Sequence, residues 1–254
     1  MASAGAAIPA HAALPALHVR VLLNGRNLLS SRNCRGAISR IPSLSPGALR
    51  LGKSPPARRM TVRAARTESG GIALGFRAPE FELPEPLTGK LWKLEDFETY
   101  PALLVMFLCN HCPFVKHLKK DIVKLANFYM QKNLAIVAIS SNSVETHPQD
   151  GPKLMAEEAK LFGYPFPYLY DESQDVARAF GAVCTPEFLL FKKDGRRPFE
   201  LFYHGQFDDS RPGNGIPVTG RDLSLAIDCV LSGQPLSAPQ KPSVGCSIKW
   251  HPGK

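Results

Sequence analysis

The first 67 residues contain no aspartate or glutamate, and the first acidic residue of the chain is Glu68. The same stretch holds ten arginines and one lysine. Without these eleven residues the rest of the chain has 20 basic and 22 acidic residues, a net charge of −2, although the full chain carries +9. The basic character therefore belongs to the N-terminal segment, and we expect no nucleic-acid partner.

Long apolar runs are also missing. Nowhere do 18 apolar residues follow one another, so we expect no membrane span. The stretch 10–23 is interrupted by Pro15, two histidines and Arg20, which excludes a secretory signal. A leader rich in Arg, Ser and Ala but lacking acids is typical of organelle transit peptides. We expect residues 1–64 to be a disordered chloroplast transit peptide and the protein to reside in the stroma. A mitochondrial presequence and a basic tail without a targeting role are the alternatives.

Cysteines are few for a chain of 254 residues, and their spacing does not indicate a secreted disulfide scaffold. Two of the six lie in the tetrapeptide Cys109-Asn110-His111-Cys112, between an apolar run at 102–108 and an amphipathic segment that begins at Pro113. A buried strand would thus deliver two thiols to the start of a helix, where N–H groups and the helix dipole stabilise a thiolate. The spacing lets the two cysteines form a disulfide, so it predicts thiol–disulfide exchange.

Hydrophobic periodicity predicts one domain over residues 72–232 and an irregular tail over 233–254, which is rich in Pro, Ser and Gly. The sequence contains no internal repeat and no glycine-rich phosphate loop. The predicted core is a β-α-β unit followed by a helix, a β-hairpin and a helix, which is an α/β fold with a mixed sheet. The predicted strands are 102–108, 134–140, 188–191 and 199–203; the helices are 113–131, 153–162, 173–180 and 223–231; a small hairpin spans 81–94.

This element order, with Thr185-Pro186 before a late strand, resembles the thioredoxin-like superfamily. Within it the chain is similar to the AhpC/TSA (redoxin, peroxiredoxin-like) branch, and with its leader it resembles a plant organellar protein. The matching stretches are 75–81, 94–97 and 181–186. The resemblance implies a thioredoxin-like fold, a central mixed sheet flanked by helices, and an antioxidant oxidoreductase. Its partners would be a disulfide-bearing protein or small molecule and a thiol electron donor, with no cofactor and no metal.

The resemblance also implies the roles of the site residues. Cys109 would be the nucleophile, the more exposed thiol with a lowered pKa, and Cys112 would resolve the mixed disulfide. Thr185-Pro186 would form a cis-proline loop that binds an extended substrate. The position of His111 between the cysteines adds a prediction of its own: an imidazolium there would favour the thiolate and raise the redox potential above the roughly −270 mV of thioredoxin. A solvated histidine without effect is the alternative.

Two further thiols are candidates for accessory redox roles. Cys184 precedes the cis-proline loop, where a small buried residue is an equal alternative, and Cys246 lies in the tail, where it could resolve an oxidised thiol or have no partner. Two alternatives to the main hypothesis stay open. One is a thiol-dependent peroxidase, although the Pro-x-x-x-Thr/Ser-x-x-Cys pattern of peroxiredoxins is missing. The other is a metal-binding protein using Cys109, Cys112 and His117.

Overall fold

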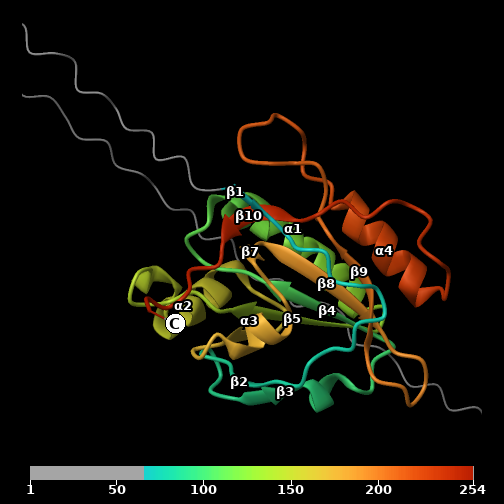
Figure 1. Ribbon diagram of the computed structural model, residues 1–254, viewed down its shortest axis with the longest axis horizontal. Helices are drawn as coiled ribbons and strands as arrows, with labels where there is room; N and C mark the ends of the chain where they lie inside the picture. The colour runs from blue at the N-terminus through green and yellow to red at the C-terminus, as the bar shows by residue number, and fades with distance from the viewer. Residues whose placement is uncertain (1–65, 254) are drawn as a thin grey trace, which may run out of the picture. The chain divides into compact units, whose positions relative to one another are not determined.

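The central sheet is mixed, with strand order β6-β5-β4-β8-β9 (Figure 1). The computed structural model describes residues 66–253, so the expected transit peptide at 1–64 lies outside the described residues. Strands β4, β5 and β6 are parallel, and β8 and β9 continue the sheet antiparallel. The strands span Ala102–Phe107 (β4), Leu134–Ser140 (β5), Tyr168–Tyr170 (β6), Glu187–Lys192 (β8) and Glu200–Gly205 (β9). The predicted α/β class and thioredoxin-like arrangement are confirmed.

The apolar runs of β4 and β5 are continuous because both faces of the sheet are covered. Leu104 and Met106 contribute to a core shared with α1 (Pro113–Met130), α2 (Pro152–Phe162) and α4 (Arg221–Leu231). Their neighbours Leu103 and Val105 point into a second core, which includes residues of α3 (Asp175–Ala179) and of the small hairpin. Figure 1 shows α3 and that hairpin together on one side of the sheet.

The remaining short elements agree with the predicted pattern. The hairpin pairs β2 (Glu82–Pro84) with β3 (Leu91–Lys93), followed by the 3-10 turn η1 (Leu94–Phe97). Proline is favoured at the first position of a helix because its missing N–H would have no partner there, and α1 and α2 both begin with one. No helix among residues 66–253 combines the length and the apolar character that a membrane crossing needs.

The expectation of an irregular tail at 233–254 is wrong for its second half. Residues Val244–Ser247 form β10, which pairs antiparallel with both β1 (Arg66–Glu68) and β7 (Cys184–Thr185). Farther along, the Lys249 N–H donates to Asn142 Oδ1 at 2.8 Å. The folded unit therefore extends beyond both limits of the predicted domain at 72–232. A four-residue strand among Pro, Ser and Gly is too short to show the alternation that predicts strands.

Candidate active site

The two cysteines of the tetrapeptide lie in the short connection between β4 and α1. Cys109 follows the end of β4, and Cys112 is the N-cap residue of α1. Their sulfur atoms are within hydrogen-bonding reach of each other. The Cys109 Sγ is 3.2 Å from the hydroxyl of Thr185, and the Cys112 Sγ is 3.2 Å from the Thr185 carbonyl oxygen. These two contacts place the predicted substrate loop against both thiols. The Thr185–Pro186 peptide bond in this loop is cis.

The expected lowering of the Cys109 pKa is wrong, and Cys109 is scarcely more exposed than Cys112. Both cysteines are buried, with 1% of Cys109 and 0% of Cys112 exposed. Burial, the hydrogen bond with Cys112 and the charge of Asp150 raise the pKa of Cys109 well above its usual value. Hydrogen bonds from the thiols of Cys109 and Cys246, and from the backbone N–H of Val115, lower the pKa of Cys112. Of the two cysteines, Cys112 at the helix start therefore has the lower pKa.

Cys246 completes a group of three thiols. It lies on β10, directly opposite Thr185 in the β10–β7 pairing, and only 3% of it is exposed. Both its thiol and its backbone N–H hydrogen-bond to Cys112. The sequence marks Cys246 only as a candidate, because the strand that carries it to the site has no recognisable pattern.

Asp150 is the polar residue of this site that the sequence does not reveal. It ends the 3-10 turn η2 (Pro148–Asp150), and its side chain is fully buried. Its Oδ1 accepts the backbone N–H groups of Asn110 (2.8 Å) and His111 (3.1 Å), while its Oδ2 accepts Nδ2 of Asn142 (2.9 Å). Burial by itself would raise the pKa of Asp150, but the hydrogen bonds from His111 and Asn142 outweigh it and lower the pKa.

His111 is paired with that carboxylate. Its Nδ1 lies 2.5 Å from Asp150 Oδ2, and its ring packs against that of His147, tilted by 33°, with centroids 4.4 Å apart. Burial and the charge of His111 lower the pKa of His147. The structure thus pairs His111 with a buried carboxylate, and the expected effect of His111 on the cysteine thiolate stays a prediction.

The structure does not bring together the three residues expected as metal ligands, Cys109, Cys112 and His117. His117 does not face the cysteines, because its Nε2 contacts the hydroxyl of Ser210 at 2.8 Å. Among the described residues, the structure instead gathers candidate ligand atoms of Cys109, His111 and Asp150 within 4.8 Å of one another.

Cys184 points into a structural network. Its thiol lies 3.5 Å from Glu187 Oε2, and burial together with that carboxylate raises its pKa. Glu187 also accepts the backbone N–H groups of Val183 (2.9 Å) and Cys184 (3.0 Å), and its other oxygen lies 2.7 Å from Nε2 of the buried His204. These contacts fix the chain on both sides of Pro186. They favour the small buried alternative for Cys184, and the sequence offers no sign of the Glu187–His204 pair.

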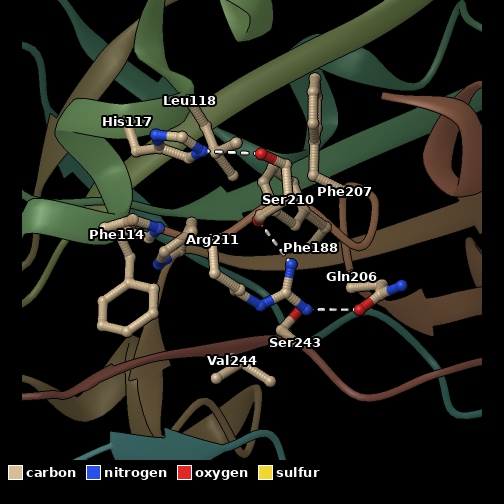
Figure 2. Close-up of a pocket in the computed structure, with 12 residues that line it drawn as sticks. Phe114, His117, Leu118, Phe188, Gln206, Phe207, Ser210, Arg211, Ser243 and Val244 are labelled. Carbon is tan, nitrogen blue, oxygen red and sulfur yellow. Dashed lines mark hydrogen bonds between the residues drawn. The ribbon is translucent and has the colours of Figure 1, made fainter. Parts of the chain in front are cut away.

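The hollow nearest the site is small. It lies between the first turns of α1, Pro186 and the start of β10, and its free volume of about 10 Å³ is room for about one water. Figure 2 shows His117 directed at Ser210, and Arg211 directed at Gln206, across this hollow. This cavity is therefore too small to hold a substrate.

The sheet order, the paired cysteines at a helix start and the cis-proline loop define the thioredoxin-like class of oxidoreductases. The AhpC/TSA family model matches residues 74–196, a range that includes the whole site except Cys246. The chain has a thioredoxin-like fold, and over these residues it is similar to the AhpC/TSA family, as the sequence predicts.

Three relatives extend this finding. The chain is 27% identical over 131 residues to the thiol-disulfide oxidoreductase ResA of Geobacillus thermodenitrificans, spanning 51% of this chain and 70% of ResA. A crystal structure of an uncharacterized conserved protein from Geobacillus kaustophilus is 49% identical, with a TM-score of 0.71, over 75% of this chain and 98% of that chain. A hypothetical protein from Sinorhizobium meliloti is 48% identical, with a TM-score of 0.70, over 74% and 100%. The chain is an oxidoreductase enzyme, as the sequence predicts.

Proposed function

We propose that this protein is a thiol–disulfide oxidoreductase whose Cys109–Cys112 pair alternates between dithiol and disulfide. The proposal depends on one observation: the two sulfurs are within reach of each other, and each contacts Thr185 at 3.2 Å. Substrates would be protein or small-molecule disulfides, and an external thiol would supply the electrons. The name of the ResA relative supports this class of reaction.

The charges at the site suggest how the first step proceeds. The Cys109 thiol donates a hydrogen bond to the Cys112 thiolate. As Cys109 attacks a substrate disulfide, its proton passes to Cys112, a bond forms between Cys109 and one substrate sulfur, and the other substrate sulfur leaves as a thiolate. That leaving thiolate then takes a proton from solvent. Cys112 then attacks the Cys109 sulfur, which closes the protein disulfide. The proton of Cys112 goes to the second substrate sulfur, which leaves as a thiol.

Reduction of a protein disulfide by residues 66–254 tests the proposal, with dithiothreitol as electron donor. We expect Cys109→Ser to abolish turnover and Cys112→Ser to hold the substrate as a mixed disulfide on Cys109. Cys229→Ser, on α4 and away from these contacts, is the matched control and should retain full activity. Unchanged turnover in Cys109→Ser would refute the proposal.

An antioxidant role follows if the substrates are thiols oxidised by peroxide. The alternative, direct peroxide reduction, requires a sulfenic acid on one of the two cysteines. Hydrogen peroxide turnover, with dimedone trapping of sulfenic acid, separates the two: the proposal expects trapped product far below that of a peroxiredoxin measured in parallel. Metal analysis of dialysed protein tests the third alternative, in which Cys109, His111 and Asp150 hold an ion.

We further propose that residues 1–64 direct the protein to the chloroplast stroma. The support is compositional: eleven basic residues and no acid before Glu68. Import into isolated chloroplasts, with cleavage before Arg66, is the expected result. Import into mitochondria alone would contradict it.

A further inference from the structure

The segment that carries Cys246 is docked against the substrate loop. Strand β10 pairs with β7 so that Cys246 lies opposite Thr185, and Ile248 N–H donates to the Val183 carbonyl at 2.9 Å. The backbones approach so closely that a Cβ on Gly245 would lie 2.0 Å from the Thr185 carbonyl oxygen. Glycine at 245 is thus required for this docking, which fills the backbone edge that an extended substrate would otherwise use.

This docking brings a third cysteine to Thr185, the residue that the other two already contact. The sulfurs of Cys109 and Cys112 each lie 3.2 Å from an oxygen of Thr185, and Cys246 is the residue opposite Thr185 on the neighbouring strand. Cys112 therefore has a cysteine neighbour on each of two segments. Cys246 is 3% exposed and Cys112 is fully buried, so a disulfide between them would lie beneath the protein surface. The other buried thiol nearby, Cys184, is instead turned to the Glu187 carboxylate.

We propose that Cys246 is a third redox-active thiol. By intramolecular thiol–disulfide exchange it replaces Cys109 as the disulfide partner of Cys112. This rests on the proposed function, because that function supplies the Cys109–Cys112 disulfide. Cys246 attacks the Cys112 sulfur, the Cys112–Cys246 bond forms and the Cys109–Cys112 bond breaks. The proton of the Cys246 thiol ends on Cys109. The exchange has no net oxidation, and it returns Cys109 to the thiol form, ready for a second substrate.

The exchange would allow the protein to store one disulfide while its substrate-facing thiol is free. Since Cys246 belongs to a strand hydrogen-bonded to the substrate loop, the new disulfide would also tie β10 to the start of α1. Reduction of the Cys112–Cys246 bond by the external thiol donor would then release it.

Disulfide mapping in the single variants tests the inference. Reduced Cys109→Ser protein is treated with oxidised glutathione, quenched in acid, alkylated and mapped by mass spectrometry. Cys112 attacks glutathione disulfide and releases one glutathione, and Cys246 then displaces the second. We expect a Cys112–Cys246 linkage in Cys109→Ser and glutathionylated Cys112 in Cys109→Ser/Cys246→Ser. Glutathionylated Cys112 with a free Cys246 in the single variant would overturn the inference.

Two further proteins keep the test decisive. If Cys109→Ser does not fold, partially oxidised wild-type protein should contain both linkages, and a wild-type map showing only Cys109–Cys112 would overturn the inference. Gly245→Ala should reduce the Cys112–Cys246 linkage at least ~10-fold, because docking sets the effective concentration of Cys246, and leave Cys109–Cys112 intact. An unchanged linkage would contradict the docking argument. Loss of the Cys109–Cys112 disulfide in Cys246→Ser would instead refute the proposed function.

Discussion

The Nδ1 atom of His111 lies 2.5 Å from Oδ2 of Asp150, and the same carboxylate accepts the backbone N–H of His111. A buried anion therefore occupies the amino end of the segment that carries both cysteines. It takes the N–H groups of Asn110 and His111 that could otherwise stabilise a thiolate on Cys109. The Asp150 charge thus raises the pKa of Cys109 and disfavours a thiolate there.

Replacing Asp150 by Asn removes the negative charge near Cys109. Because that charge raises the pKa of Cys109, we expect Asp150→Asn to lower it and to make the pair a stronger oxidant. The pH dependence of iodoacetamide alkylation of Cys109, read by mass spectrometry, measures the first effect, and equilibration with glutathione measures the second. Asp171→Asn replaces another buried carboxylate that does not contact the cysteines, and it should leave both quantities unchanged. Equal alkylation curves for wild type and Asp150→Asn would contradict this electrostatic account.

Asp150 and His147 should each give the folding stability a pH dependence, in separate windows. The pKa of His147 is lowered from 6.5, so its contribution is present above about pH 6.5 and is lost as the pH falls toward its folded-state value. The pKa of Asp150 is lowered from 3.8, so its contribution is present above that pH and is lost as the pH falls through the lower folded-state value. Urea unfolding across both windows should show two losses of stability. His147→Gln should remove the upper one and leave the lower one unchanged, and a single loss in wild type would refute the assignment.

The Glu187–His204 pair should be important for stability and for the cis-proline loop. Glu187→Ala leaves the N–H groups of Val183 and Cys184 and the ring of His204 without their partner. Each buried donor left unsatisfied costs about 1–3 kcal/mol, so we expect a loss of several kcal/mol in the free energy of unfolding. Glu172→Ala, at an exposed position, is the control and should change stability little. Denaturant unfolding of both variants checks this, and similar midpoints for the two would show that the pair is dispensable.

The sequence predicts those parts of the fold whose pattern is local. The continuous apolar run of β5 and the three- and four-residue spacing on α1 identify these elements within a residue or two. The CxxC tetrapeptide and Thr185-Pro186 similarly identify the centre of the site. The sequence does not reveal contacts between distant segments, such as that of Asp150 with His111, 39 positions apart. It does not reveal β10 either, because this strand has only four residues. The ionisation of the cysteines could not be predicted either, because it depends on which donors three separate segments bring to Cys112.

The location of the thiolate gives the last prediction. Cys112 accepts hydrogen bonds from two thiols and from the backbone N–H groups of Val115 and Cys246, and these lower its pKa. At neutral pH the reduced protein should therefore show the ultraviolet absorbance of one thiolate. We expect Cys112→Ser to abolish it, while Cys109→Ser should retain it with a pKa shifted upward, since a serine hydroxyl still donates to Cys112. Cys246→Ala removes a donor without a replacement and should raise the pKa of Cys112 further than Cys246→Ser does. Loss of the absorbance in Cys109→Ser, with its retention in Cys112→Ser, would mean that the thiolate is on Cys109, as the resemblance alone implies.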